Sequence, residues 1–572
     1  MPHQGTGGEL VVEVLVSLGI RHVFGVPGGQ TLAITDAMLD RDDIQFVTAR
    51  HEGAAAVMAD AYGRLTGTPG VCLATTGPGA TNLLTGVGGA YRDSSPVIVI
   101  TCNNNAENIE KDDAQAANHV EIFRSLTKWS RLVTHGSSIR QAMEEGYVNA
   151  MTGTRGPVLL DFARDAIEGD VGRWGRESGP HPVRAWVDQR PTADQRAVAI
   201  AASKIAAAAR PVLWVGNGAA SREVSAAVLA FAEQFEVPVI TTFAGIGAVP
   251  TSHPMTFGPL SRMGTELSTR VLHDADVVIA VGNSLNSVST SRWKLDLPET
   301  IQLDLNPSVI GRYYADRTYG LVGDAASTIT SLGSCLLERD DTSATVKARH
   351  EWVSGLCRAK AEWWQRAHSS AARALDADQD PISPADLVCH LRAVVPSETV
   401  LIADAGNPGV WSYVWEVQHV GEYLKPVGFG NMGFGVPAAI AAAVIEPERP
   451  VLALVGDGSL GMSMGELETL SRVGGRVVIV VLNDGGYGNI RQEQVLKYGP
   501  RTIGVDFGAA QYATVAEGLG IRAHVARSLK AAGELVADAF LAARPVLVEV
   551  RIDPSISAWT YPMFRPFEPA GE

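Results

Sequence analysis

The chain has 572 residues, 46% of them hydrophobic and 19% charged, and this composition excludes a disordered or fibrous protein. A formal net charge of −15, without a run of lysines and arginines, argues against DNA or RNA as a partner. The 5 cysteines lack CxxC spacing, and neither a leader peptide nor a run of about 18 apolar residues is visible, so we expect a cytoplasmic protein without disulfides, zinc or membrane contact.

The first segment, residues 1–172, alternates helical stretches such as GELVVEVLVSLG with short β-rich runs such as HVFGVP and PVIVITC. This alternation predicts a parallel sheet with helices on both faces. The stretch FVTARHEGAAAVMADAYGRLTG puts Glu52 where a strand gives way to a helix. An acidic residue there also stabilises a helix N-terminus by about 0.3–1 kcal/mol, so a purely structural role for Glu52 is the alternative.

Two further segments repeat the alternating pattern. A polar stretch over 172–195 is interpreted as a linker, and a second domain is expected over 190–340. A charged helical stretch near 345–375 precedes a third domain over 375–555, and an aromatic, proline-bearing tail occupies 556–572. The predicted fold class is therefore α/β, with three consecutive doubly wound parallel-sheet domains.

The strongest chemical motif is VGDGSLGMSMGELETL in the third segment, followed by VVIVVLNDGGYG. Two neighbouring strands end here on acidic residues, so Asp457 and Asp484 can meet as oxygen ligands beside the backbone at Gly486. Mg²⁺ prefers such carboxylates together with phosphate oxygens and water. A helix starting at this turn, which holds Gly456, Gly458 and Ser459, offers free N–H groups to a diphosphate. GDG alone is also a common tight turn, and the second acidic residue is what favours a metal site.

With these motifs the chain resembles the thiamine-diphosphate enzyme family, whose metal and diphosphate motif begins with GDG and ends in paired asparagines. The resemblance covers all three segments, which would be the pyrimidine-binding, central and diphosphate-binding domains. It implies thiamine diphosphate and Mg²⁺ as cofactors. Asp484 departs from the family, in which an asparagine is the usual ligand at that place, and the change adds a negative charge beside the metal.

The resemblance also implies roles for individual residues. Glu52 would hydrogen-bond the aminopyrimidine ring of the cofactor and so activate it, as a general acid and base. Met432 would be the wedge between the two cofactor rings, and the Gly430 carbonyl would accept from the amino group. The other cofactor-binding residues implied are Gly77, Pro78, Gly79, Asn82, Gly406 and Asn407.

Glu52 and the metal ligands lie in different segments, so one chain need not complete its own site. In the family the pyrimidine domain of one subunit faces the diphosphate domain of another. The resemblance therefore implies a homodimer at least, and often a homotetramer.

Within the family the chain is most similar to acetolactate synthase-like enzymes, but its site departs from theirs. Gln115 keeps the family's active-site glutamine, whereas Ala114 and Ala116 replace the Phe and Glu that flank it. Glu493 stands where a tryptophan closes the pyruvate pocket, and the carboxylate-binding arginine is missing from NSLNSVSTS (283–291). The carboxylate of a free 2-oxo acid would be repelled by Glu493 and would find no arginine to pair with. A neutral thioester carbonyl would avoid both penalties.

The chain accordingly looks like the 2-hydroxyacyl-CoA lyases, relatives of oxalyl-CoA decarboxylase. Its substrate would be a small molecule, a CoA thioester. Glu493 would take the proton of the 2-hydroxyl group, and the products would be formyl-CoA and an aldehyde or ketone. The alternatives are a carboligase that uses a 2-oxo acid and a non-catalytic relative. Glu493 could also be a solvated helix acid, and the tail either a lid over the active site or a packing arm.

Overall fold

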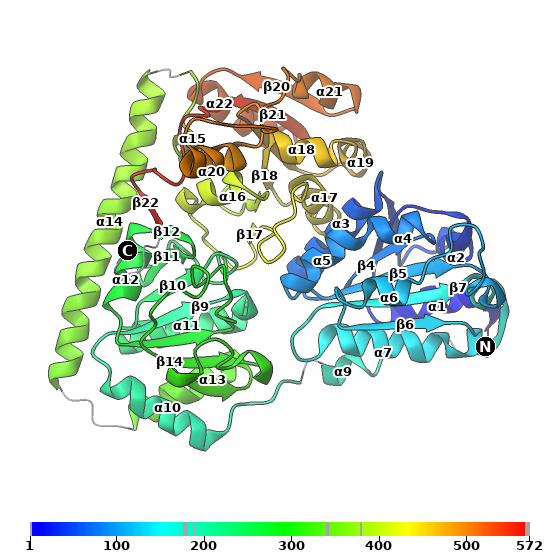
Figure 1. Cartoon of the computed structure of the whole chain (residues 1–572), viewed down its shortest axis with the longest axis horizontal. Coiled ribbons are helices and arrows are strands. Elements are labelled where there is room, and N and C mark those ends of the chain that lie inside the picture. The colour runs from blue at the N-terminus through cyan, green and yellow to red at the C-terminus, as the bar shows by residue number, and fades with distance from the viewer. Residues whose placement is uncertain (1–2, 175–180, 188, 339–342, 378–379, 567–572) are drawn as a thin grey trace.

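The computed structural model describes residues 3–174, 181–187, 189–338, 343–377 and 380–566. Its core is three parallel sheets of six strands each, one after another along the chain, which confirms the predicted α/β fold class with three doubly wound domains (Figure 1). Parts of the expected linker (175–180 and 188), of the second domain (339–340), of the third domain (378–379) and of the tail (567–572) lie outside the described residues.

The first sheet has the strand order β3-β2-β4-β5-β7-β6. Its central strands are buried along their whole length, as the continuous apolar runs of a parallel sheet require. The strands are β2 (His22–Gly25), β3 (Gln45–Thr48), β4 (Gly70–Ala74), β5 (Val97–Asn103), β6 (Trp129–Val133) and β7 (Pro157–Ala163). The helices are α1 (Gly7–Ser17), α2 (Leu32–Leu39), α3 (Glu52–Thr66), α4 (Pro78–Asn82), α5 (Leu84–Arg92), α6 (His119–Phe123), α7 (Ile139–Met151) and α8 (Arg164–Glu168). An antiparallel pair, β1 (His3–Thr6) and β8 (Asp170–Trp174), completes this domain.

The central sheet has the order β11-β10-β9-β13-β14-β15. Its strands are β9 (Pro211–Val215), β10 (Val239–Thr242), β11 (Thr256–Leu260), β13 (Val277–Val281), β14 (Glu299–Asp304) and β15 (Thr318–Val322). The short helix α9 (Arg184–Val187) precedes it, and its own helices are α10 (Gln195–Ala207), α11 (Arg222–Phe235), α12 (Glu266–Asp274) and α13 (Ala325–Leu337).

The third sheet has the order β17-β16-β18-β19-β21-β20. Its strands are β16 (Val400–Ala403), β17 (Tyr423–Leu424), β18 (Val451–Gly456), β19 (Val477–Asn483), β20 (Arg522–Ala526) and β21 (Val546–Arg551). Its helices are α15 (Pro384–Val394), α16 (Asn407–Trp411), α17 (Gly435–Ile445), α18 (Asp457–Ser463), α19 (Glu466–Val473), α20 (Gly488–Tyr498), α21 (Tyr512–Gly518) and α22 (Leu529–Leu541).

The long helix α14 (Ser343–Ala377) runs along the central and third domains (Figure 1). Arg349 on it donates to the carbonyls of Ile205 and Ala208 at the end of α10, and Trp363 donates to the Met563 carbonyl in the tail. In the part of the chain that the structure describes, no helix combines the length and apolar composition needed to cross a membrane.

The first and third domains pack against each other through α3 and α17. Both helices are rich in buried alanines, and such small side chains let two backbones approach closely. Because α3 begins at Glu52, this contact fixes the position of Glu52 relative to the third domain of the same chain.

Candidate active site

The order of the strands explains where the candidate residues gather. In the first sheet the order reverses between β2 and β4, and in the third sheet between β16 and β18. Ligands of open α/β sheets bind at the carboxyl ends of strands at such reversals. Gly77 follows β4 there, and Gly406 and Asp457 follow β16 and β18.

Glu52 is the first residue of α3, directly after the loop that leaves β3. The side-chain amide of Asn82, the last residue of α4, donates to Glu52 Oε2 at 2.9 Å. The backbone N–H groups of Arg50 and His51 donate to Oε1 of the buried Glu466, each at 3.0 Å. Glu52 is therefore held by its own helix, by α4 and by α19.

The loop before α4 has a conformation that requires glycine. Gly77 has φ +59° and ψ −110°, and a Cβ there would lie 2.5 Å from the Gln115 carbonyl oxygen. Gln115 itself has φ +59°, and its carbonyl accepts from Thr76 Oγ1 at 3.2 Å. Gln115 and Pro78 are exposed, whereas Gly77 and Gly79 are buried. The structure thus brings Glu52, Gly77, Pro78, Gly79, Asn82 and Gln115 into one group.

The second group of candidate residues surrounds Asp457 in the third domain. Asp457 begins α18 and is 2% exposed, and its Oδ2 has no hydrogen-bond partner among the described residues. Ser459 Oγ and Asn407 Oδ1 are likewise buried without a partner in that part of the chain. Burial, and then the neighbouring Asp484 carboxylate, raise the pKa of Asp457 to about 7. Burial also raises the pKa of Asp484, against the opposing effect of Arg491.

These residues fit Mg²⁺ and a diphosphate. A cation would satisfy the unpartnered Asp457 oxygen and offset the repulsion between the two carboxylates, and phosphate oxygens would complete its shell. No cluster of three or more His, Cys, Asp or Glu side chains suited to a metal is found in the described residues. A Cβ on Gly488 would lie 1.7 Å from Asp484 Oδ2, and one on Gly458 would lie 2.8 Å from Tyr487, so only glycine keeps this loop closed over the acidic pair. Gly486 is buried in the same loop.

Met432 lies beside the same turn. Its Cε would be 3.4 Å from a Cβ on Gly458, and the preceding Gly430 has φ +70°. The loop that carries both is fixed by the first domain, because Asp93 accepts from the backbone N–H groups of Val427 and Gly428 at 3.1 and 2.6 Å. Met432 thus lies beside the turn that begins with Asp457, and its role as a wedge between two cofactor rings stays a prediction.

Glu493 lies on α20, which starts just after the Asp484–Gly486 loop. Its carboxylate is partly exposed and forms an ion pair with Lys497 at 3.2 Å. The adjacent Gln492 is buried and bonds the tail, donating to the Ile556 carbonyl at 3.3 Å and accepting from Ser557 Oγ at 3.1 Å. The tail therefore contacts α20 at Gln492, the residue before Glu493.

Beyond that point the described part of the tail is a packing element. Phe564 is 3% exposed and contacts the rings of Trp411 and Tyr413. The strand β22 (Phe564–Pro566) pairs antiparallel with β12 (Met263–Thr265), so the tail joins the third domain to the central one (Figure 1).

Comparison with known proteins agrees with this geometry. Models of the thiamine pyrophosphate enzyme N-terminal TPP binding domain, central domain and C-terminal TPP binding domain match residues 5–122, 198–332 and 404–550. The chain is 32% identical over 565 residues to a probable acetolactate synthase large subunit of Methanocaldococcus jannaschii, with 96% of this chain and 92% of that protein covered. The chain belongs to the thiamine pyrophosphate enzyme family. It is also 29% identical to the acetolactate synthase large subunit of Haemophilus influenzae over 574 residues, with 98% and 96% covered. The isozyme 1 large subunit of Escherichia coli is 29% identical over 565 residues, with 98% and 96% covered.

The two groups of candidate residues of this thiamine pyrophosphate enzyme come from different domains, the first and the third. In the described residues, no hydrogen bond or ion pair links a member of the Glu52 group to a member of the Asp457 group. Glu52 instead lies near α19, the helix that follows the diphosphate turn. Apolar side chains near the Asp457 group are exposed, including Met462 at 57% and Ile490 at 49%.

Sequence reasoning missed three buried residues that support the Glu52 group, namely His119, Asp161 and Glu466. Asp161 had a signal in the sequence, because it is the one acidic residue in the apolar strand PVLLDFA. His119 and Glu466 had none, since their roles arise only from the folding of distant segments onto them.

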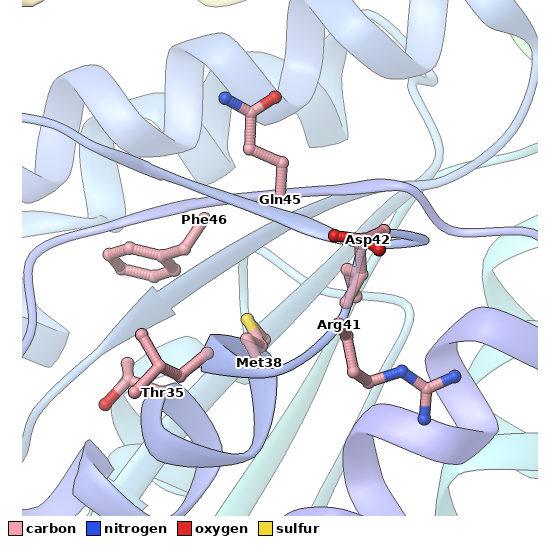
Figure 2. Close-up of a pocket in the computed structure, with 8 residues that line it drawn as sticks. Thr35, Met38, Arg41, Asp42, Gln45 and Phe46 are labelled. Atoms are coloured by element: carbon pink, nitrogen blue, oxygen red, sulfur yellow. The ribbon is translucent and has the colours of Figure 1, made fainter.

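A hollow on the first domain, between α2 and β3, lies apart from both groups (Figure 2). Its lining includes Met38, Arg41 and Phe46, and Arg41 is paired with Glu13 and Asp43, each at 2.8 Å. None of the candidate residues lines it, so it is not the reaction site.

Proposed function

We propose that this thiamine pyrophosphate enzyme cleaves a 2-hydroxyacyl-CoA into formyl-CoA and an aldehyde or ketone, and that it can also run the reverse carboligation. The observation that carries the proposal is Glu493, an acid on the helix that begins at the metal loop. It stands at the place of an aromatic wall in the acetolactate synthases that the chain resembles. Like charges in a low dielectric repel strongly, so an acid here disfavours a 2-oxo acid and tolerates an uncharged thioester.

Thiamine diphosphate, when bound, would supply a carbon nucleophile for a carbonyl group and an electron sink for the carbon–carbon bond that breaks. The residues of the chain hold and move protons around it. Glu52 would hydrogen-bond the aminopyrimidine ring nitrogen, and Asp457 and Asp484 would hold the Mg²⁺ and through it the diphosphate. Glu493 would take the proton of the 2-hydroxyl group as the C1–C2 bond breaks. That proton balances the one that formyl-CoA gains at its carbon, so the net reaction needs no oxidant or reductant.

A second candidate function is an acetolactate synthase-like carboligase acting on a 2-oxo acid. The names of the relatives favour it over the lyase. The site residues favour the lyase, because Ala114 and Glu493 leave a 2-oxo acid without the two aromatic walls of that enzyme type. The two candidate functions use the same cofactor-binding residues and differ in the substrate group that faces Glu493.

Paired assays separate the two functions. Formyl-CoA release from a 2-hydroxyacyl-CoA is compared with CO₂ release from pyruvate, in the wild type and in Glu493→Gln. We expect thioester cleavage in the wild type and a loss of at least about 100-fold in kcat for the variant, as for a lost general base. Lys497→Gln is the matched control, because it removes the ion-pair partner and keeps the carboxylate. Turnover of pyruvate with an inert thioester would establish the carboligase instead.

We also propose that the protein is cytoplasmic and forms at least a homodimer, two of which assemble into a homotetramer. The Glu52 and Asp457 groups come from different domains, and Met462 and Ile490 beside the Asp457 group are exposed, which supports a second subunit at each site. All 5 cysteines are free thiols in the structure.

A further inference from the structure

A buried histidine–aspartate pair lies directly behind the Gly77 loop. His119 is 0% exposed and Asp161 1% exposed, and His119 Nδ1 is 2.9 Å from Asp161 Oδ1. The other ring nitrogen, Nε2, is 3.1 Å from the backbone nitrogen of Gly77. The imidazole thus connects an acidic residue in the centre of β7 to the loop that leaves β4.

The hydrogen bonds around His119 determine which ring nitrogen carries the proton. The Gly77 N–H can only donate, so Nε2 must be the acceptor, and the proton lies on Nδ1 and is donated to Asp161. Asp161 accepts further hydrogen bonds from Thr101 Oγ1 at 2.7 Å and Asn103 Nδ2 at 2.8 Å. Asp161 is thereby fixed as an acceptor toward His119, and the tautomer follows.

His119 fixes the position of Gly77, which leads into α4, the helix next to Glu52. Gly77 has a backbone conformation open only to glycine and is followed immediately by α4. The last residue of α4, Asn82, donates to Glu52, and a Cβ on Gly79 would lie 3.5 Å from Glu52 Oε1. A shift of Gly77 would therefore move the groups that set the orientation of Glu52.

We propose that His119, held by Asp161 as the Nδ1–H tautomer, is a positioning residue that keeps Gly77 and α4 in the arrangement through which Glu52 activates the cofactor. The inference rests on the proposed role of Glu52. His119 is fully buried behind the Gly77 loop, so it acts through that loop. The same logic applies wherever a buried aspartate fixes the tautomer of a histidine that another group depends on.

Two variants of His119 separate its bond to Asp161 from its contacts at Nε2, which lies 3.1 Å from the Gly77 nitrogen and 3.4 Å from Thr76 Oγ1. In His119→Gln the amide oxygen reaches the Nε2 position and can still accept from Gly77, whereas in His119→Asn the amide reaches only the Nδ1 position and can only bond Asp161. Asp161→Asn is the third variant. Its amide group would donate to Nδ1 and force the proton onto Nε2, where it would meet the Gly77 N–H.

The readout is exchange of the cofactor's C2 proton with deuterium in the enzyme loaded with thiamine diphosphate and Mg²⁺, measured without substrate by NMR after acid quenching. Cofactor affinity and melting temperature are measured in parallel. We expect exchange to slow about tenfold or more in His119→Asn and Asp161→Asn, the size of effect that one lost buried hydrogen bond produces. We expect His119→Gln to stay within about threefold of the wild type.

Glu52→Gln provides the reference that separates the two hypotheses. If Glu52→Gln exchanges as fast as the wild type, the proposed role of Glu52 is wrong, and the inference falls with it. If Glu52→Gln is slow but His119→Asn matches the wild type, only the inference is overturned. Equal loss of exchange and of melting temperature in His119→Asn and His119→Gln would also overturn it, since a purely structural histidine would not distinguish them.

Discussion

Asn82 donates its side-chain amide to Oε2 of Glu52 at 2.9 Å, which ties the last residue of α4 to the first residue of α3. The two helices leave different strands, β3 and β4, so this bond joins two loops at the strand ends. It leaves the other carboxylate oxygen, Oε1, beside Gly79. Glu52 thus has one oxygen anchored and one turned toward the Gly77–Gly79 loop.

Removal of this anchor should weaken activation of the cofactor without unfolding the protein. Asn82 is exposed, so Asn82→Ala creates no cavity, but a carboxylate loses a hydrogen bond worth about 1 kcal/mol at such a site. We expect kcat to fall about fivefold with an unchanged melting temperature. Thr81→Ala is the matched control, because Thr81 is exposed on the same helix and bonds only the Pro78 carbonyl. An unchanged kcat in Asn82→Ala would contradict the anchoring role.

The acidic pair at the metal loop predicts a pH dependence of Mg²⁺ binding. The pKa of Asp457 is raised from 3.8 to about 7, by burial first and by Asp484 next. The folded, metal-free chain therefore binds a proton more tightly than the unfolded chain, and it loses stability as the pH rises from about 4 to about 7. Because Mg²⁺ competes with that proton, its apparent affinity should rise up to tenfold per pH unit and level off above about 7.

Asp484→Asn tests the contribution of the like charge. We expect the pH at which Mg²⁺ affinity levels off to fall, and the metal-free variant to melt at a higher temperature than the wild type at about pH 8. Titration of Mg²⁺ in the presence of thiamine diphosphate between about pH 5.5 and 8 measures the first, and thermal melting the second. A Mg²⁺ affinity that does not change over this range would contradict the assignment of Asp457 as a ligand.

Much of the fold could be predicted from the sequence because parallel sheets carry a strong local signal. Strands such as Val97–Asn103 are continuous apolar runs that end in polar or glycine residues, and Asp457 and Asp484 follow two of them directly. The strand ends therefore located the candidate metal site. The support of Glu52 by Glu466 could not be predicted in this way, because 414 positions separate the two and no local pattern records that contact.

The tail shows the same limit. Its aromatic composition was compatible with a lid or with a packing arm, and only the burial of Phe564 between Trp411 and Tyr413 indicates packing for the described part. The surface that an aromatic side chain of the tail covers depends on how the central and third domains are arranged in space. The tail of this chain holds no pattern that specifies it.

Two substitutions in the tail should therefore have different effects. Phe564→Ala removes a ring that is 3% exposed, and we expect a loss of about 3–5 kcal/mol in the free energy of unfolding. Ser557→Ala removes the bond to Gln492, next to Glu493, and the bond that Ser557 Oγ accepts from the Trp559 N–H. We expect a higher KM for the thioester, with a melting temperature much closer to that of the wild type than in Phe564→Ala. Denaturant unfolding and steady-state kinetics measure the two effects. If Ser557→Ala leaves KM unchanged, the tail is a packing arm alone.

A mixing experiment tests whether each site is shared between two subunits. Glu52→Gln and Asp457→Asn each disable one of the two groups, and each variant alone should be inactive. In a random mixture, half of the dimers contain one chain of each kind, and each such dimer has one site with both groups intact if the sites are shared. We expect about a quarter of the wild-type activity.

If each chain completed its own site, every site in the mixture would carry a defect and the activity would stay near zero. Two different affinity tags isolate the mixed dimer, so a failure of the subunits to exchange can be distinguished from sites built within one chain.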